Sequence, residues 1–437
     1  MSSQPHPKYM ATIDRYYIDT RSLVPALSKA EPSPPLPLLS TLQFSDQEAV
    51  TRFIRPADRF MSLASALLKY TFIHRRAKVP WSHVQISRTP HPHRRPYWAP
   101  TEDWEPPEED TGRIGGLEFN VSHQAGLVAI VGCGIPTAQL PTLDAHHIPP
   151  SDSSTLVGSF DGLDLTGHHT LSLAPGEVRL GVDIACTNED KRTPQDITSQ
   201  AKFDEWVDIF AEMFSDRERW NMRHAPIHVP VVEHEEGDYW DSDSSSADTA
   251  NGEATLVSLK LRRFYAYWAL KEAYIKMVGE GLLANWLREL EFLNVVAPAS
   301  PVNHQNRHHN PNSSRALSPS PNKPPHVQHN NRPHVDVMKW TSPERAERGT
   351  TTLLYGRRVE DVDVELVAYD EDFILATAMR GVKEPEPGDR PGDRARWKRW
   401  VRLDIEEDIR PCAEGRCRCL GQPPGPTIQA MARKGDK

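Results

Sequence analysis

The sequence contains no long hydrophobic run. Its longest apolar stretch, residues 127–135, is interrupted by glycines and is far shorter than the ~20 residues that a transmembrane helix requires. Residues 1–20 also lack a basic segment followed by an apolar core, so they do not resemble a secretory signal. We therefore expect a soluble, cytoplasmic protein that does not enter a membrane.

Cysteine and net positive charge are also scarce. The 437 residues include five cysteines, of which Cys133 and Cys186 are isolated, and this pattern gives no disulfide framework. The formal net charge is −9, whereas a protein that coats nucleic acid needs a basic surface. A disulfide-stabilised scaffold and a general nucleic-acid binder are therefore excluded.

Proline, by contrast, is abundant, with 39 residues against a usual share of roughly 5%. Three proline-, serine- or histidine-rich segments without apolar periodicity, 136–175, 221–256 and 297–337, interrupt the chain, and a similar tail covers 381–437. Such segments bury too little apolar surface to offset the entropy lost on ordering. We predict three disordered insertions and a disordered tail, within which residues 397–405 could still pack on the fold.

The remaining sequence forms two similar halves, residues 1–180 and 181–380. In each half, apolar residues at helical spacing precede two runs with the composition of strands. The expected elements are a helix at 60–73 with strands within 117–131, and a helix at 257–278 with strands at 362–369 and 373–379. Helix and antiparallel strands, occurring twice, predict an α+β fold of two related, pseudo-symmetric subdomains with a cleft between them.

The strongest local pattern is Trp268-Ala-Leu-Lys-Glu-Ala-Tyr-Ile-Lys276. On a helix, Trp268, Glu272 and Lys276 lie one turn apart, so a carboxylate and an ammonium project beside an aromatic ring. Spacing alone is compatible with a surface ion pair. The alternative is a pair of charges that point into a cleft, because these residues share the stripe expected to face the core.

Three other polar residues allow both a functional and a structural interpretation. Asp183 lies in a short apolar strand, where a carboxylate needs a bound cation or backbone hydrogen bonds. Glu218 ends Ser215-Asp-Arg-Glu, which is also a capping-box pattern at a helix start. His123 follows Phe119-Asn-Val-Ser at the end of a strand, a position that suits anion binding or simple surface exposure.

The order of these motifs carries more information than any one of them. They are Arg59, Arg95-Pro96, Phe119-Asn-Val-Ser122-His123, Gly181-Val-Asp183, Phe214-Ser-x-x-Glu218, and Trp268-x-x-Lys-Glu272-x-x-x-Lys276 followed by Gly279-x-Gly-Leu. This series resembles the larger, monomeric class of 4′-phosphopantetheinyl transferases, the surfactin-synthetase-activating type. The resemblance covers residues 45–380 once the insertions are skipped, and the length and insertions are most similar to fungal members.

The resemblance implies that coenzyme A binds in the cleft and that Mg²⁺ assists catalysis. By motif matching, His123 and Ser122 contact the 3′-phosphate, while Arg59 and Arg95, which precedes Pro96, help to hold phosphates. Asp183 and Glu272 match the magnesium ligands, and Glu218 matches a position that is either a third ligand or the base. Glu272 is the alternative base, and Lys276 matches the lysine near the pyrophosphate. Two positions depart from the family pattern: Ala185 stands where bacterial members carry a second acidic residue, and Arg95 replaces the usual lysine.

The implied activity is the transfer of 4′-phosphopantetheine from coenzyme A to a serine of an apo-carrier domain. Adenosine 3′,5′-bisphosphate leaves. The implied partners are carrier domains of polyketide synthases, nonribosomal peptide synthetases, aminoadipate reductase or fatty acid synthase, with roles in secondary metabolism and lysine biosynthesis. The alternative is a non-catalytic coenzyme A or nucleotide-binding regulator, in which Ala185 marks a lost metal site. The joint presence of Asp183, Glu272 and Lys276 argues against it.

Cys412, Cys417 and Cys419, together with the histidine-rich stretch 304–334, raise the possibility of metal binding. Their spacing, Cys-x4-Cys-x-Cys, offers three ligands, whereas structural zinc takes four in a tetrahedron. No fourth ligand is evident in the sequence nearby. We therefore expect the tail to be disordered rather than to bind zinc.

Overall fold

A computed structural model describes most of the two predicted halves. The described residues are 12–24, 35–89, 95–105, 107–109, 112–136, 178–188, 197–227, 246–280, 284–298, 346–370, 372–381 and 397–421. Nearly all of the insertions predicted at 136–175 and 297–337 lie outside them. The insertion predicted at 221–256 is described at both ends, where residues 221–224 and 246–256 belong to helices instead.

The first half packs one long helix on an antiparallel sheet. Helix α2 (Pro56–Ala77) begins with proline at its first turn, where no backbone donor is lost, and it follows α1 (Phe44–Thr51). The sheet has the order β13-β1-β6-β5-β4. Its strands are β1 (Asp14–Asp19), β4 (Glu108–Glu109), β5 (Gly112–Gln124), β6 (Leu127–Pro136) and β13 (Val401–Arg402). The helix at 60–73 and the strand pair within 117–131 are thus confirmed.

The second half repeats this arrangement. Helix α5 (Ser246–Val278) packs on a sheet of order β11-β12-β7, and Gly279, with φ +82°, ends the helix. The strands are β7 (Arg179–Cys186), β11 (Val362–Tyr369) and β12 (Phe373–Arg380). Helices α3 (Gln200–Ile209) and α4 (Asp216–His224) lie against α5. The predicted α+β class, with related halves, is confirmed.

Shorter elements complete the two halves. In the first half these are η1 (Arg21–Leu23), η2 (Leu39–Thr41), η3 (Trp81–His83), β2 (Ile86–Arg88) and β3 (Pro96–Trp98). In the second half they are η5 (Leu287–Glu289) and a small sheet of β8 (Leu290–Leu293), β9 (Thr351–Leu354) and β10 (Arg357–Arg358). None of the helices in the described ranges is both long and apolar enough to cross a membrane.

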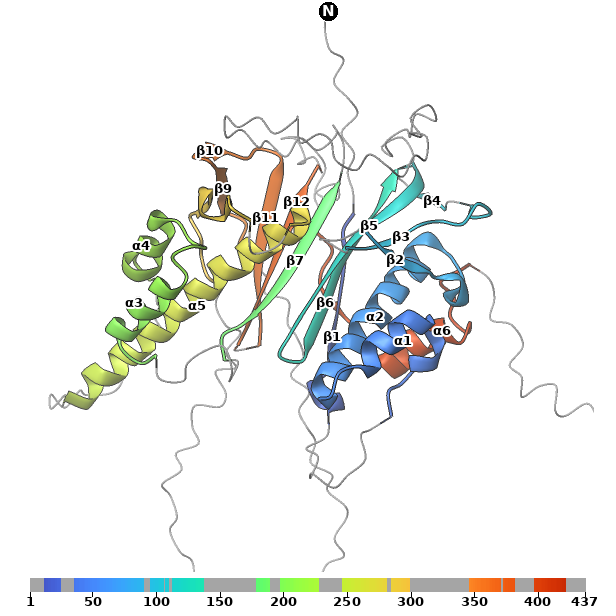
Figure 1. The fold of residues 1–437 in the computed structure, drawn as a ribbon, viewed down its shortest axis with the longest axis horizontal. Helices are drawn as coiled ribbons and strands as arrows, with labels where there is room; N and C mark the ends of the chain where they lie inside the picture. The colour runs from blue at the N-terminus through green and yellow to red at the C-terminus, as the bar shows by residue number, and fades with distance from the viewer. Residues whose placement is uncertain are drawn as a thin grey trace, which may run out of the picture.

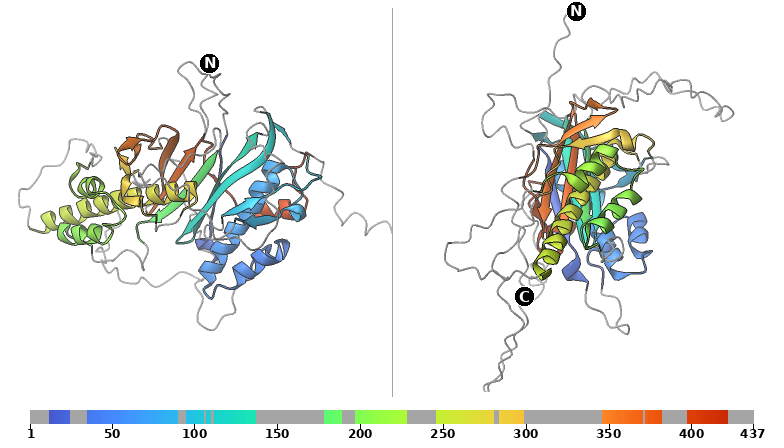
Figure 2. Two further views of the ribbon diagram at one scale, coloured as in Figure 1. Left: turned by 45° about the horizontal axis from the view of Figure 1, so that its top comes forward. Right: turned by 90° about the vertical axis from the view of Figure 1, so that its left-hand side faces the viewer.

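The two sheets lie face to face in the middle of the molecule, with α2 and α5 on the outer sides (Figures 1 and 2). Three buried clusters follow from this order of layers. One lies between α2 and the first sheet, one between α5 and the second sheet, and one between the sheets, where Tyr17 and Val131 meet Val182 and Leu375. The halves therefore share a continuous core.

Strands β5 and β7 join the halves through side chains instead of a backbone ladder. Because residues two apart in a strand face the same side, alternate side chains of β5 can reach the neighbouring strand. Three of them accept hydrogen bonds from backbone N–H groups of β7: Glu118 from Leu180 (3.1 Å), Asn120 from Val182 (3.0 Å) and Gln124 from Cys186 (3.1 Å). Ser122 belongs to the same alternating series.

The C-terminal segment returns to the first half of the chain. Strand β13 pairs in parallel with β1, and the following turns, η7 (Ile405–Ile409) and α6 (Arg410–Ala413), carry Ile405, Ile409 and Cys412 into the cluster beneath α2. The prediction that residues 381–437 form a disordered tail is therefore wrong for residues 397–421. Their apolar side chains, few and far apart in sequence, complete a core that residues 12–136 leave open.

Candidate active site

Ser122, Asp183 and Lys276 meet where the two halves join. Ser122 lies on β5, Asp183 on β7 and Lys276 in the last turn of α5. Lys276 Nζ is 2.5 Å from Asp183 Oδ1 and 3.0 Å from Ser122 Oγ, and the Ser122 hydroxyl donates to the same Asp183 oxygen at 3.1 Å. Sequence analysis predicted all three as site residues, but it assigned Ser122 to the 3′-phosphate together with His123, whereas the structure places the Ser122 hydroxyl beside Asp183 and Lys276.

The environment of Asp183 favours a cation. The side chain is 7% exposed, and its burial raises the pKa of Asp183, while Lys276 and the Ser122 hydroxyl oppose the shift. A buried carboxylate is costly unless positive charge or hydrogen-bond donors compensate it. In this structure the Lys276 ammonium supplies that positive charge.

Gly181 explains how α5 comes so close to Asp183. A Cβ added at Gly181 would lie 2.0 Å from the Ala273 carbonyl oxygen and 2.5 Å from the Met277 nitrogen. Gly181, Asp183 and Ala185 share one face of β7, so the glycine allows the helix to lie directly over this face. Ala185 packs into the cluster beneath α5 and offers no ligand atom.

Glu272 lies on α5 one turn before Lys276 and therefore on the same side of the helix. It is partly buried, whereas Lys271, its neighbour in sequence, is fully buried. The helix thus points Lys271 into the core of the second half, and Lys276 reaches the junction, where it contacts Asp183 and Ser122. For Lys276 this favours a charge at the junction of the halves, while the place of Glu272 at the junction stays a prediction.

His123 lies at the end of β5, beside the start of α2. The strand turns into β6 through Ala125 and Gly126, whose φ values of +47° and +90° suit a two-residue hairpin, and Gly126 N contacts Met61 of α2 at 3.2 Å. His123 is exposed, yet the surrounding protein lowers the pKa of His123, and the charge of Lys276 lowers it further. A neutral imidazole therefore stands near a helix N-terminus, which is a favourable place for an anion.

The two predicted arginines make protein contacts. Arg59 Nε donates to the Phe53 carbonyl at 2.5 Å. The Arg95 guanidinium binds the Glu118 carboxylate and donates to the carbonyls of Leu180 (3.0 Å) and Met277 (3.2 Å). Arg95, which precedes Pro96 at the start of β3, thus ties the end of α5 to both central strands. Their roles as phosphate ligands stay predictions.

Glu218 lies in the core of the second half. It forms the capping box with Ser215 at the start of α4, and one oxygen also accepts from Phe292 N at 2.9 Å. The other oxygen is 2.9 Å from Lys271 Nζ, and both side chains of this ion pair are 0% exposed. Burial raises the pKa of Glu218 and lowers that of Lys271. This is the arrangement of a structural carboxylate, and the predicted role as metal ligand or base finds no support in it.

Sequence analysis assigned no role to Lys271, although it stands inside the Trp268–Lys276 motif. The one available signal was a lysine on the apolar side of an amphipathic helix, which requires a buried acidic partner. The sequence could not identify that partner as Glu218, which is 53 residues earlier by numbering.

The residues at the junction fit a magnesium site in part. Magnesium takes oxygen ligands and is commonly held by one or two carboxylates together with substrate phosphates. Asp183 supplies a buried carboxylate, and the second predicted carboxylate, Glu272, lies one helical turn before Lys276 on α5. Ala185 excludes a third carboxylate from β7, so the protein contribution is limited to these two groups.

Comparison with known proteins identifies the family of the chain. The family model for the N-terminal part of 4′-phosphopantetheinyl transferases matches residues 32–135, and the model for the 4′-phosphopantetheinyl transferase superfamily matches residues 179–322. These matches cover the elements that carry Ser122, His123, Asp183, Glu272 and Lys276. The chain belongs to the 4′-phosphopantetheinyl transferase family and is an enzyme of that class.

Fungal relatives extend the similarity over almost the whole chain. The 4′-phosphopantetheinyl transferase A of Aspergillus fumigatus is 39% identical, over 94% of this chain and 97% of its own length. The 4′-phosphopantetheinyl transferase NpgA of Emericella nidulans is 38% identical, over 93% and 96%. A 4′-phosphopantetheinyl transferase of Aureobasidium melanogenum is 33% identical, over 90% and 95%.

Proposed function

We propose that this enzyme transfers the 4′-phosphopantetheine arm of coenzyme A to a serine of acyl or peptidyl carrier domains, with Mg²⁺ bound beside Asp183. The observation that carries the proposal is the contact of Lys276 with Asp183 and Ser122 across the junction of the halves. A positive side chain, a buried carboxylate and a hydroxyl converge there, as cleavage of a pyrophosphate requires.

His123 and the start of α2 bind the adenosine end of coenzyme A in this proposal. The His123 ring, held at the end of the β5–β6 hairpin, donates a hydrogen bond to the 3′-phosphate, and the backbone N–H groups at the start of α2 favour the same negative charge. Arg59, in the first turn of α2, would help to hold the phosphates of coenzyme A. Coenzyme A would then extend from His123 toward Lys276.

Asp183 and Glu272 are the two residues that would hold the metal. A bound divalent ion would neutralise charge that develops on the pyrophosphate. Because a bound metal ion would neutralise the negative charge of Asp183, Lys276 would be able to leave Asp183 and pair with the pyrophosphate. Ser122 keeps the Asp183 oxygen oriented through its hydroxyl.

Proton transfer is assigned to the two charged residues of α5. The carrier serine oxygen forms a bond to the β-phosphorus, and its proton passes to Glu272, directly or through water. The bond between this phosphorus and the bridging oxygen breaks, and Lys276 stabilises or protonates the oxygen of the departing adenosine 3′,5′-bisphosphate. We assign Glu218 to a supporting role, because its carboxylate is occupied by Lys271 and backbone donors.

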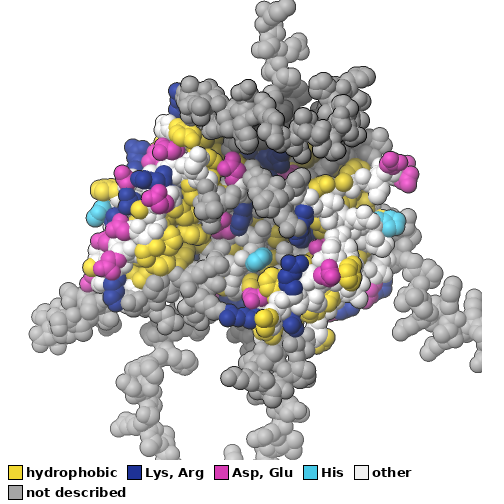
Figure 3. All heavy atoms as spheres, viewed as in Figure 1, with side chains coloured by type: hydrophobic (Ala, Val, Ile, Leu, Met, Phe, Trp, Pro, Cys, Tyr) yellow, Lys and Arg dark blue, Asp and Glu magenta, His cyan; other side chains and the backbone are white. Residues whose placement is uncertain are grey.

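The carrier domain would dock beside the start of α2. The segment between α1 and α2 exposes Phe53 and Ile54, which are 40% and 89% exposed, next to the exposed Arg52 and Arg55. Figure 3 shows basic and hydrophobic side chains beside each other on this face. The resemblance implies an acidic carrier helix, to which such a mixed surface is complementary.

The alternative of a non-catalytic coenzyme A-binding regulator is not favoured. The similarity to the transferases named above covers nearly their entire lengths. In addition, a binding module has no need of Lys276 beside two carboxylates. We further propose that the enzyme acts as a monomer in the cytoplasm and serves carrier domains of secondary metabolism and lysine biosynthesis.

A direct assay tests the proposal. The protein is incubated with coenzyme A, magnesium and a panel of apo-carrier domains, and the carriers are analysed by intact mass spectrometry. The expected product is heavier by roughly 340 Da, the mass of a covalently added phosphopantetheine, and a carrier with its serine replaced by alanine stays unmodified. If all carriers stay at their apo mass while coenzyme A still binds, the regulator is the correct interpretation.

A further inference from the structure

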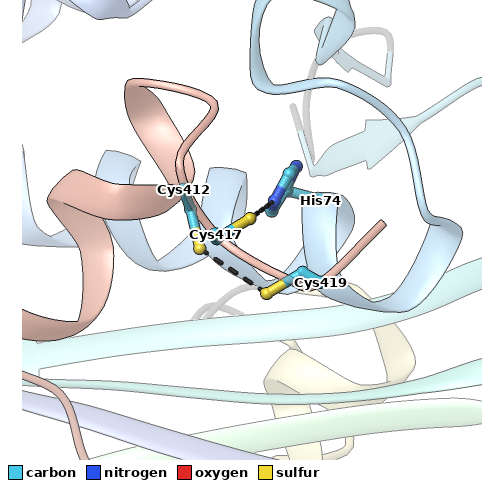
Figure 4. A group of neighbouring side chains, drawn as sticks. All are labelled: His74, Cys412, Cys417 and Cys419. Carbon is cyan, nitrogen blue, oxygen red and sulfur yellow. Dashed lines mark hydrogen bonds between the residues drawn. The ribbon is translucent and has the colours of Figure 1, made fainter. Parts of the chain in front are cut away.

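Four potential metal ligands converge far from the junction of the halves. His74 comes from the last turn of α2, while Cys412, Cys417 and Cys419 come from the C-terminal segment (Figure 4). Their ligand atoms all lie within 4.8 Å of one another. His74 and Cys412 are buried, and Cys417 and Cys419 are partly buried.

The separations of the four atoms are close to those of a tetrahedral centre, with one sulfur–sulfur distance equal to the expected value and the nitrogen–sulfur distance shorter than expected. Zinc–sulfur bonds of about 2.3 Å and zinc–nitrogen bonds of about 2.0 Å place two sulfurs about 3.8 Å apart, and a sulfur and a nitrogen about 3.5 Å apart. The Sγ atoms of Cys412 and Cys419 are 3.8 Å apart, and His74 Nε2 is 3.1 Å from Cys417 Sγ. One cation can therefore reach all four atoms after small side-chain movements.

The surroundings of His74 orient it as a ligand. Its Nδ1 is 2.7 Å from the Val79 carbonyl oxygen, and because a carbonyl only accepts, Nδ1 carries the proton. The lone pair is then on Nε2, which points toward the sulfurs. A metal-bound histidine is commonly held in this way, with its other nitrogen donating to a backbone carbonyl.

A positive side chain lies beside the cysteine cluster and opposes the rise in the pKa of the Cys412 thiol that burial causes. Arg75, next to His74 on α2, interacts with the Cys412 sulfur and donates to the Asp408 carbonyl at 2.8 Å. Three thiolates and a neutral imidazole around a divalent ion leave one negative charge, which the guanidinium can neutralise. Such soft ligands select zinc over magnesium.

We propose that His74, Cys412, Cys417 and Cys419 bind one structural zinc ion, which is separate from the catalytic magnesium. All four tetrahedral positions are filled by protein, so the site has no open position for a substrate. The ion cross-links the end of α2 to a segment more than 330 residues later and fastens the C-terminal segment to the first half.

This proposal departs from our expectation that the cysteine-rich tail binds no zinc. The spacing of the three cysteines did lack a fourth ligand nearby, but the fold supplies it from α2, 343 residues from Cys417. The proposal is independent of the transferase reaction, because none of its four ligands contacts Ser122, Asp183 or Lys276.

Metal content tests the proposal without coenzyme A or a carrier. The full chain is purified under reducing conditions, dialysed, and analysed for metals by plasma mass spectrometry, and thiol-bound zinc is released with a mercurial and titrated with a chromogenic chelator. We expect one zinc per chain for the wild type. Cys417→Ser and His74→Ala should retain zinc at least about tenfold less well, whereas Cys133→Ala, which changes a buried cysteine outside the cluster, should keep it.

A second measurement covers variants that fail to fold. Replacement of the zinc in the wild type by Co²⁺ should give the visible absorption of a tetrahedral cobalt–thiolate centre, and removal of the metal should lower Tm. Readdition of zinc, but not of magnesium, should restore Tm. The proposal is overturned if the folded wild type contains no thiol-bound metal, or if its mass shows a disulfide among the three cysteines.

Discussion

Glu218 and Lys271 form an ion pair in which neither side chain is exposed, with 2.9 Å between Oε2 and Nζ. The pair connects the start of α4 to the C-terminal part of α5, and Lys271 also donates to the Leu287 carbonyl at 2.9 Å. Since Glu272 follows Lys271 directly, this anchor fixes the rotation of α5 about its axis. It thereby determines which helix face presents Lys276 to the junction of the halves.

The first prediction concerns this anchor. Lys271→Met leaves a buried carboxylate without its cation and should destabilise the protein by about 3–5 kcal/mol, measured by urea unfolding. Combining it with Glu218→Gln removes the negative charge, so the double variant should be more stable than Lys271→Met alone. If Glu218 is supporting, the folded double variant retains transferase activity. Complete loss of activity in a stably folded double variant would return Glu218 to the catalytic groups.

The second prediction concerns Lys276 and Asp183. Lys276→Met should lower kcat by about 10²–10⁴ with little change in the KM for coenzyme A, because leaving-group charge exists only in the transition state. Burial raises the pKa of Asp183 and Lys276 opposes this shift. Protonated Asp183 cannot bind a metal, so activity falls as pH drops through this pKa, and loss of Lys276 should move that fall to higher pH.

Pre-steady-state rates measured across the acidic range check this prediction, with Asp183→Asn and excess EDTA as inactive references. An unchanged acidic limb in Lys276→Met would mean that another group controls metal binding. Full turnover of Asp183→Asn would remove the metal site from the mechanism.

The third prediction concerns His123. A hydrogen bond to a charged phosphate contributes about 1.5–3 kcal/mol, so His123→Ala should raise the KM for coenzyme A roughly ten- to a hundredfold. Dephospho-coenzyme A, which lacks the 3′-phosphate, should be nearly indifferent to the change. Since the pKa of His123 is lowered, the ring is neutral at neutral pH and gains charge as pH falls. Mild acidification should therefore lower the KM of the wild type for coenzyme A but leave its KM for dephospho-coenzyme A nearly unchanged. Equal sensitivity of both substrates would show that His123 does not bind this phosphate.

The fourth prediction concerns Gly181. Gly181→Ala forces a methyl group to within 2.0 Å of the Ala273 carbonyl oxygen, so α5 must move away from β7. Overpacking of this kind costs about 1–3 kcal/mol, and the displaced Lys276 should also reduce kcat. Gly349→Ala is the control, because its added Cβ meets nothing within 4 Å. Equal Tm values for the two variants would contradict the close approach of helix and strand.

Local patterns predicted a large part of the fold. Apolar residues at helical spacing identified α2 and the C-terminal part of α5, and alternation identified β5, β6, β11 and β12, because burial of one face depends on nearby sequence. The order of the motifs also identified Ser122, Asp183 and Lys276 before their contacts were known. These residues lie on regular elements, which bring them together once the two halves pack.

Contacts between distant segments could not be predicted in this way. The partner of Lys271, the parallel pairing of β13 with β1, and the approach of His74 to Cys417 each join residues that no local periodicity relates. The apolar residues of 397–413 are too sparse to predict order by themselves. They become ordered because the core beneath α2 has space for them, which is a property of the tertiary structure.

The return of the C-terminal segment also constrains when the protein can fold. During synthesis the first half emerges early, yet Leu403, Ile405 and Ile409, which belong to its buried cluster, leave the ribosome only after the whole second half. Until then β1 keeps an unpaired edge and α2 an uncovered apolar surface, both of which favour aggregation. The first half therefore stays incompletely folded while some 260 further residues are synthesised, from 137 to 397. Chaperones would be needed most during this interval.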